Sequence, residues 1–291
     1  MTSWAPQIGG HTQIIGVLNF TPDSFSDGGR YRDVDAAVAA ALALVAAGAH
    51  IVDVGGESTR PGAERVPAAV EQARILPVIG ALAGAGVTVS VDTMNAGTAA
   101  AAAGAGASIV NDVSGGLADP DMYAVVATRQ LGYIAMHWRG HSAGMQRLAD
   151  YGDVVAEVRR ELGERLEAMT GAGISPERIV LDPGLGFSKT PEHNWRLLGH
   201  LDQIASLGCP LLIGASRKRF LGPMTVTSAR LFGEEPATAT PAEDASARDL
   251  PTAVVSALAA MAGVWGVRVH DVSSTRSAMA VAVAWRDGGR T

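Results

Sequence analysis

The sequence predicts a single-domain α/β protein built as a (β/α)8 TIM barrel, and three observations favour this fold class. Eight short apolar runs alternate with segments of helical character, at roughly 35 residues per unit. Nearly every run ends in a polar residue followed by a glycine-rich turn. The chain of 291 residues, 47% of them hydrophobic, can enclose one large core. An open doubly wound sheet uses the same units, but the count of eight and the polar strand ends favour the barrel.

The expected strands are apolar runs without alternation, which is typical of parallel strands buried on both faces. The first, Ile14–Asn19, stops abruptly before a loop rich in Pro, Gly, Ser and Asp. The others follow at His50–Val54, Val87–Asp92, Ser108–Asp112, Gly132–His137, Arg178–Asp182, Pro210–Ala215 and Gly266–His270.

Capping residues and periodicity indicate the helices between the strands. We expect Asp33 to cap a helix that runs to Ala47 before Gly48, and Asp119-Pro120 to open the fourth helix. The helix from Asp150 to Thr170 is the clearest, because apolar residues recur there every three to four positions. Further helices are expected from Pro67 to Ala83 with Val70 and Ala73 facing inward, up to Gly104 or Gly106, from Thr190-Pro191, at Leu250–Ala262 and near Thr275–Trp285.

The domain organisation follows from these elements. Residues 1–13 are expected to be a lead-in and residues 14–291 the barrel. Residues 223–249 are rich in Ala, Thr, Pro and acidic residues and lack periodicity, so we predict a mobile insertion after the seventh strand.

Composition excludes several classes of protein. The formal net charge of −6 argues against a nucleic-acid surface. The N-terminus does not resemble a signal peptide, and no apolar run approaches the ~20 residues that a membrane span needs. Cys209 is the only cysteine, so no internal disulfide can form, and we expect a cytoplasmic protein.

The polar residues at the strand ends are the candidate site, because the carboxyl ends of barrel strands meet at one mouth. Asp92 and Asp182 close apolar runs, so their charges should be partly desolvated and need donors. A ligand with several N–H groups, such as an aminopyrimidinone ring, would supply them. The alternative is that Asp and Asn merely begin turns. The full set is Asn19, Asp53, Asp92, Asn111, Asp112, His137, Asp182, Ser216 to Arg219, Arg268 and His270.

Basic residues form a second group near the seventh and eighth strands, where barrels often bind phosphate. Arg268 and His270 are two residues apart on one strand and should face the same side. Arginine contacts phosphate oxygens in bidentate fashion. Arg217 and Arg219 could instead be a solvated surface pair.

Several motifs together resemble the dihydropteroate synthase family, in the same order from about Ile14 to Trp285. The two longest, after the first and second strands, are the most specific. The motifs are Val17–Gly29, Asp53–Gly62, Ser90–Thr93, Asn111–Gly115, Met136-His137, Leu181–Phe187, Gly214–Lys218 and Arg268–Asp271.

The resemblance implies that a 7,8-dihydropterin carrying CH2-O-diphosphate loses pyrophosphate to 4-aminobenzoate, giving 7,8-dihydropteroate. It implies Mg²⁺ near Asn19, two mobile loops at Phe20–Tyr31 and Gly55–Ala63, a homodimer, and a target of sulfonamides. The catalytic residues that it implies are Asn19, Asp23, Arg60, Lys218, Arg268 and His270.

The resemblance also implies the substrate contacts. Those to the pterin are Asp92, Asn111, Asp182 and Lys218, with Met136 and Phe187 as apolar walls. Those to the diphosphate are Thr59, Arg60, Arg268 and His270. Ser216 and Thr59 lie where 4-aminobenzoate is held.

Three other readings remain open. A pterin-binding relative without synthase activity, or a folate methyl-transfer domain, would share the acidic pocket but would not be expected to keep the diphosphate residues. A Schiff-base aldolase could use Lys218, but it has no use for the two signature loops. A metal hydrolase would need a His-x-His pair, which His137 lacks, so we expect His137 to be a structural residue bonding across the barrel mouth.

Overall fold

The computed structural model describes residues 10–20, 30–57, 66–140, 145–222, 231, 233 and 245–289. Its strands form one eight-stranded parallel sheet in the order β6-β5-β4-β3-β2-β1-β8-β7. The two ends of this order meet at a single parallel bridge between Leu181 and Leu211, so the sheet curls into a nearly closed barrel. The predicted fold class is therefore confirmed. The strands are β1 (Gln13–Asn19), β2 (Ile51–Gly55), β3 (Val89–Asp92), β4 (Ile109–Asp112), β5 (Gly132–Met136), β6 (Ile179–Asp182), β7 (Leu212–Ile213) and β8 (Gly266–Val269).

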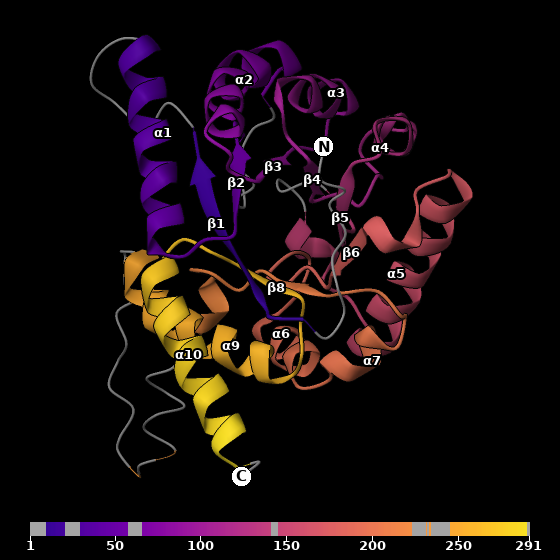
Figure 1. Ribbon diagram of the computed structural model, residues 1–291. Coiled ribbons are helices and arrows are strands. Elements are labelled where there is room, and N and C mark those ends of the chain that lie inside the picture. The colour runs from indigo at the N-terminus through magenta and orange to yellow at the C-terminus, as the bar shows by residue number, and fades with distance from the viewer. Residues whose placement is uncertain are drawn as a thin grey trace.

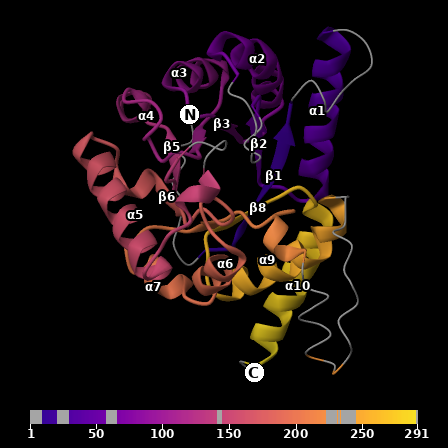
Figure 2. The same ribbon diagram turned by 180° about the vertical axis from the view of Figure 1, so that it is seen from behind.

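Helices surround the strands as an outer ring, which is visible from both sides of the molecule (Figures 1 and 2). None of the described helices combines the length and the apolarity that crossing a bilayer would require. The helices are α1 (Arg30–Ala47), α2 (Ala68–Gly84), α3 (Ala96–Ala105), α4 (Met122–Arg129), α5 (Val154–Gly171), α6 (Pro191–Leu198), α7 (Leu201–Ala205), α9 (Asp249–Met261) and α10 (Val272–Gly288).

The core has two parts, as the barrel architecture requires. The larger part fills the space between the sheet and the helices, and a smaller cluster fills the barrel interior. That inner cluster consists of Ile15, Ile51, Ile109, Ile134, Val180, Leu212 and Trp265. Because the interior is filled with side chains, any substrate must bind at the mouth.

Two of the expected helix caps are wrong. Asp33 lies inside α1, which begins at Arg30. Asp119 does not cap α4. Its carboxylate accepts hydrogen bonds from the backbone N–H groups of Ala96 (2.8 Å) and Asp121 (3.0 Å), so it ties α3 to the loop before α4. The Asp119-Pro120 pair indicates a turn, but the Asp119 side chain binds the first turn of α3 instead of α4.

Other element predictions had mixed outcomes. Helix α5 buries the apolar face expected of it, and Thr190 opens α6 with a capping box. Helix α2 turns Glu71, Ile75, Val78, Ile79 and Leu82 inward, and leaves both Val70 and Ala73 exposed, contrary to expectation. Most of the predicted insertion, residues 223–249, lies outside the described residues, apart from 231, 233 and the short 3-10 turn Ala245–Arg248 that leads into α9.

Candidate active site

The ends of β2, β3, β4 and β8 bring three predicted site residues together around Asp53. The Arg268 guanidinium donates from Nε to Asp53 Oδ2 (2.6 Å) and from Nη2 to Asp92 Oδ2 (2.7 Å). The Asn111 amide donates to the same Asp53 oxygen (3.0 Å). Asp53, Asp92 and Asn111 are buried. An arginine, two carboxylates and an amide thus form one polar network at the mouth.

Burial controls the charge of these acids. The pKa of Asp92 is raised to about 7, because burial and the nearby Asp53 carboxylate raise it more than the Arg268 cation lowers it. Burial also raises the pKa of Asp182, against the Lys218 ammonium and a hydrogen bond from Gly184. Both acids therefore favour a ligand that donates hydrogen bonds to them, as their place at the end of apolar runs predicted.

Asp182 faces Lys218 across Gly214 at the ends of β6 and β7. A Cβ atom on Gly214 would lie 3.4 Å from Asp182 Oδ2 and 3.9 Å from Lys218 Nζ, so the absence of a side chain keeps this space open. Lys218 also donates to the backbone carbonyl of Leu185. The pKa of Lys218 is lowered to about 8. Burial lowers it most, the Asp182 carboxylate raises it in part, and repulsion from Arg268 lowers it further.

Ser216 and His270 are joined at the ends of β7 and β8. The Ser216 hydroxyl lies 2.8 Å from His270 Nδ1 and accepts a hydrogen bond from the His270 backbone N–H (3.1 Å). The structure thus places two predicted contacts of different substrates side by side. Arg217 beside them is not a solvated residue, because it forms a bidentate pair with Asp249 at 2.7 and 2.8 Å.

Asn19 ends β1 next to Asp92. A Cβ on Gly55 would lie 3.4 Å from Asp92 Cβ and 3.8 Å from Asn19 Oδ1, so the two side chains approach each other over this glycine. An amide oxygen is a suitable ligand for Mg²⁺, which usually takes few protein ligands and completes its shell with phosphate and water. Asn19 fits that role. Asp23, Thr59 and Arg60 lie outside the described residues.

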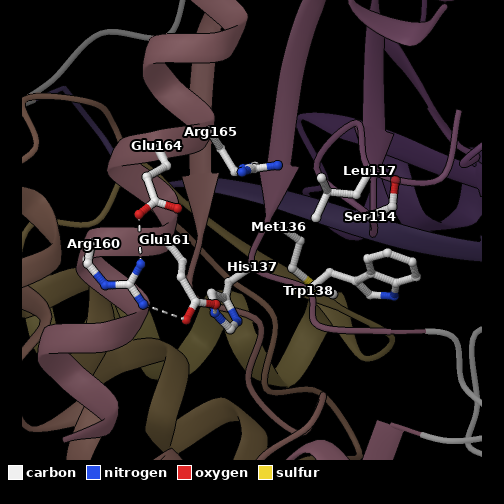
Figure 3. Close-up of a pocket in the computed structure, with 9 residues that line it drawn as sticks. All are labelled: Ser114, Leu117, Met136, His137, Trp138, Arg160, Glu161, Glu164 and Arg165. Carbon is white, nitrogen blue, oxygen red and sulfur yellow. Dashed lines mark hydrogen bonds and ion pairs between the residues drawn. The ribbon is translucent and has the colours of Figure 1, made fainter. Parts of the chain in front are cut away.

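Met136 and Phe187, the two predicted apolar walls, flank the mouth. Met136 is buried at the end of β5. The Phe187 ring lies in the loop after β6, with Lys218 Nζ 4.8 Å from its centroid. A cavity of about 250 Å³ lies at the end of β5, where Met136, His137 and Trp138 line it together with residues of α5 and of the loop after β4 (Figure 3).

Asp112, which sequence reasoning placed among the candidate site residues, is fully occupied by the protein. Its carboxylate accepts hydrogen bonds from the Ser114 N–H (2.8 Å) and hydroxyl (2.7 Å), from the Gly116 N–H (2.9 Å), and from the Tyr133 hydroxyl (2.7 Å). Asp112 therefore shapes the loop after β4, and the alternative that some of these acids begin turns holds for this one.

Sequence reasoning missed the group around Lys189. Lys189 is buried and lies 2.9 Å from His137 Nδ1, whose other nitrogen lies 2.9 Å from Glu161 on α5. His137 is structural, as expected, but its partners are Lys189 and α5, not residues across the mouth. The only feature of the sequence that could have indicated this group is a lysine at the end of a loop of small and apolar residues.

Comparisons with known proteins agree with this geometry. The family model described as pterin binding enzyme matches residues 15–270. The chain is 52% identical to the dihydropteroate synthase of Mycobacterium leprae (strain TN) over 278 residues, covering 95% of this chain and 94% of that protein.

Solved structures give the same result. The dihydropteroate synthase of Xanthomonas albilineans with 4-aminobenzoic acid superposes with a TM-score of 0.83 at 36% identity, covering 99% of this chain and 100% of that one. Its complex with 7,8-dihydropteroate has a TM-score of 0.79 at 36% identity, covering 97% and 95%. The chain therefore belongs to the dihydropteroate synthases, transferases of the pterin-binding enzyme family.

Proposed function

We propose that the chain condenses 7,8-dihydropterin-CH2-diphosphate with 4-aminobenzoate, releasing pyrophosphate and 7,8-dihydropteroate. The observation that carries the proposal is the convergence of buried Asp92, Asn111 and Asp182 with Lys218 and Arg268 at one barrel mouth. The Xanthomonas albilineans structures that hold 4-aminobenzoic acid and 7,8-dihydropteroate support it.

The pterin is assigned to the acidic side of the mouth. Asp92 and Asp182 accept its ring N–H groups, and Asn111 can offer both a donor and an acceptor. Met136 and Phe187 cover the faces of the ring, and Lys218 donates to its carbonyl oxygen. Accepting N–H groups offsets the cost of burying the two carboxylates.

The diphosphate is assigned to the basic side. Arg268 uses Nε and Nη2 for its carboxylate contacts within the described part of the chain, which leaves Nη1 for a phosphate oxygen. His270, Thr59 and Arg60 complete this set, and Ser216 with Thr59 holds 4-aminobenzoate.

The chemistry needs no covalent nucleophile, because diphosphate leaves readily once its charge is neutralised. The cations stabilise charge that grows on the departing oxygens. The electron-rich pterin bears positive charge at its exocyclic carbon, so bond breaking runs ahead of attack by the amine. Asp23 follows β1 in the sequence, and we assign it to the segment that excludes water from that carbon.

We assign Mg²⁺ to Asn19, whose amide oxygen would hold the ion beside the diphosphate. When bound, it supplies further positive charge for the leaving group. Asn19 is the neutral residue that orients it, so the Asn19→Ala variant should need more Mg²⁺ for half-maximal turnover.

The proposal extends to a homodimer in the cytoplasm. Helices α9 and α10 pack side by side (Figure 1), and both carry exposed apolar side chains, which we call the apolar stripe. On α9 its members recur every three to four positions, which is one helix face. The stripe consists of Leu250, Val254, Leu258 and Met261 on α9 with Val281 and Trp285 on α10.

Turnover of dihydropterin diphosphate with 4-aminobenzoate, followed by pyrophosphate release, tests the function. A chain that binds the pterin but releases no pyrophosphate would be the non-synthase relative instead. The Asp182→Ala variant should lose pterin binding. The Arg268→Ala variant should mainly weaken binding of the diphosphate group of the substrate. A sulfonamide should compete with 4-aminobenzoate, as the Yersinia pestis synthase with a sulfonamide drug complex suggests.

A further inference from the structure

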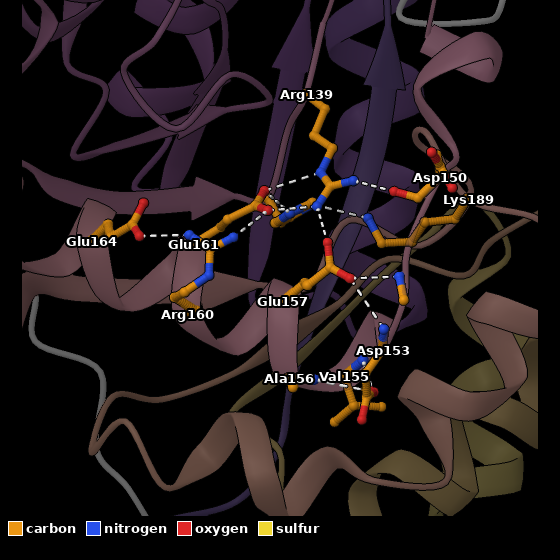
Figure 4. Close-up of polar contacts among 12 residues, drawn as sticks. Arg139, Asp150, Asp153, Val155, Ala156, Glu157, Arg160, Glu161, Glu164 and Lys189 are labelled. Carbon is orange, nitrogen blue, oxygen red and sulfur yellow. Dashed lines mark hydrogen bonds and ion pairs between the residues drawn. The ribbon is translucent and has the colours of Figure 1, made fainter.

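Lys189 lies at the end of the loop that carries Phe187, with only 3% of its surface exposed. Its ammonium lies 2.9 Å from His137 Nδ1 and donates to the Phe187 carbonyl oxygen at 3.1 Å. His137, only 2% exposed, lies 2.9 Å through Nε2 from Glu161 Oε2. Arg139 binds the same glutamate and Glu157 (Figure 4). A chain of contacts thus runs from α5 to the loop after β6.

The direction of each hydrogen bond is fixed by chemistry. The Glu161 carboxylate can only accept, so His137 donates to it from Nε2–H, and Nδ1 of the neutral imidazole accepts from Lys189. A neutral imidazole satisfies both contacts. Burial and the nearby Lys189 lower the pKa of His137 to about 4, which agrees with that state.

The backbone of His137 approaches the same loop. A Cβ on Gly184 would lie 2.3 Å from the His137 carbonyl oxygen, so only glycine allows this contact. Ser188 adopts a positive φ of 47° between Phe187 and Lys189, an uncommon conformation for a residue other than glycine. The loop is therefore held in a specific shape from both sides.

The buried Lys189 side chain gains no stability from an ion pair within the described part of the chain. Among the described residues no carboxylate oxygen lies within ion-pair distance of Lys189 Nζ, and burial lowers its pKa to about 7. A buried charge whose direct partners are an imidazole and a carbonyl costs free energy of folding. Retaining such a group is understandable where it fixes the geometry of a site.

We propose that Lys189, held by His137, is a positioning residue that fixes the Phe187 ring against the bound pterin. This inference rests on the proposed function, since it concerns the same pterin. Lys218 reaches the loop through the Leu185 carbonyl, so two lysines fix two carbonyls of one loop. Lys189 fixes the Phe187 carbonyl, and we assign it no contact with the reacting atoms.

The Lys189→Met variant tests the proposal, because methionine keeps the length of the side chain and removes its donors. The KM for dihydropterin diphosphate should rise about tenfold to a hundredfold, the loss expected from a charge-assisted hydrogen bond. The KM for 4-aminobenzoate should stay within about threefold, and the urea midpoint should be equal or higher. A purely structural lysine would lower the urea midpoint and leave both KM values alike.

Variants of His137 and of a matched basic residue complete the experiment. His137→Leu should raise the same KM and show no additive effect with Lys189→Met. His137→Asn offers an acceptor near the Nδ1 position and should recover most of the loss. Arg160→Met removes another donor to Glu161, at 3.2 Å on the exposed side of α5, and should leave the KM unchanged.

Calorimetric binding of 6-hydroxymethyl-7,8-dihydropterin separates this inference from the function. If the wild-type chain does not turn over, the proposed function fails, but the affinities of the wild type and of Lys189→Met still test the positioning role. Equal pterin affinity in the two proteins would overturn it, whatever the outcome of the turnover assay.

Discussion

At the scale of single residues, Arg268 neutralises two buried carboxylates. We predict that Arg268→Ala lowers the free energy of unfolding by about 3–5 kcal/mol at pH 8, because Asp53 and Asp92 then remain buried without a cation. Urea denaturation measures the change. Arg160→Ala is the control, since Arg160 is 58% exposed and its pairs with Glu161 and Glu164 should contribute less than about 1 kcal/mol.

The loss caused by Arg268→Ala should depend on pH. Arg268 lowers the pKa of Asp92, so its removal raises that pKa further above the unfolded value. The folded variant then binds a proton that the unfolded chain releases, and its stability increases as the pH falls from 8 to 6. A deficit that is equal at pH 8 and pH 6 would show that Asp92 does not titrate in this range.

Pterin affinity should also follow the titration of Asp92. The pKa of Asp92 is about 7, and the carboxylate form is the one that accepts an N–H of the ring. Affinity measured by calorimetry should therefore fall by up to about tenfold per pH unit below pH 7. Asp92→Asn should bind more weakly and with a flatter pH dependence. A steep dependence that survives in Asp92→Asn would assign the titration to another group, such as Asp182.

Part of this site was predictable from sequence. Asp92 and Asp182 each close an apolar run, which placed them at the mouth and predicted their desolvation. The link between Lys189 and His137 was not, because the residues are far apart in the chain and their contact depends on how two loops fold. The roles of Asp23, Thr59 and Arg60 stay predictions.

At the scale of elements, helix α3 offers a matched pair of glycines. Gly104 is exposed inside the helix with no atom near its Cβ position, whereas Gly106 has a φ of +114° and its Cβ would lie 2.5 Å from Ala83 Cβ. We predict that Gly104→Ala raises the free energy of unfolding by about 0.5–1 kcal/mol. Gly106→Ala should lower it by more than about 1 kcal/mol, since the backbone and the neighbouring helix both oppose a side chain. Thermal unfolding of both variants measures the difference.

The helix boundaries show what local signals can predict. Thr190-Pro191 was a correct start, because the capping hydrogen bonds lie within four residues. Asp33 and Asp119 also belong to a residue type that favours helix starts, but neither is a cap. Helix α1 begins before Asp33, and the Asp119 carboxylate binds the backbone N–H of Ala96 on another element. Capping preferences favour a start without specifying it, and tertiary contacts decide.

At the scale of the whole molecule, the eight repeated units were sufficient to predict the barrel. A barrel requires parallel strands of similar length with helices outside, and the apolar runs supplied both constraints. The shortness of β7 was not predictable. The run from Pro210 to Ala215 reads as a full strand, but only Leu212 and Ile213 pair as one.

The apolar stripe on α9 and α10 predicts the behaviour of the assembled protein. Leu258 is 61% exposed on α9, so Leu258→Glu should place a charge in the proposed dimer interface and weaken association at least about a hundredfold. Sedimentation velocity across a range of concentrations measures this. Val70→Glu is the control, because Val70 is 41% exposed on α2, outside the stripe. Monomeric wild-type protein would remove the dimer from the proposal.

The strand pairing of the barrel is weakest between β6 and β7, which are joined by a single bridge between Leu181 and Leu211. The hydrogen bonds of this bridge include the one from the Leu181 N–H to the Pro210 carbonyl (2.9 Å). Asp182 is the last residue of β6 on one side of this bridge, and Ser216 follows β7 on the other side. Local opening of the sheet between β6 and β7 would therefore separate the proposed pterin and 4-aminobenzoate contacts while the helices stay folded. In hydrogen exchange, the Leu181 amide should take up deuterium sooner than the amides of β2, which pairs with a strand on each side.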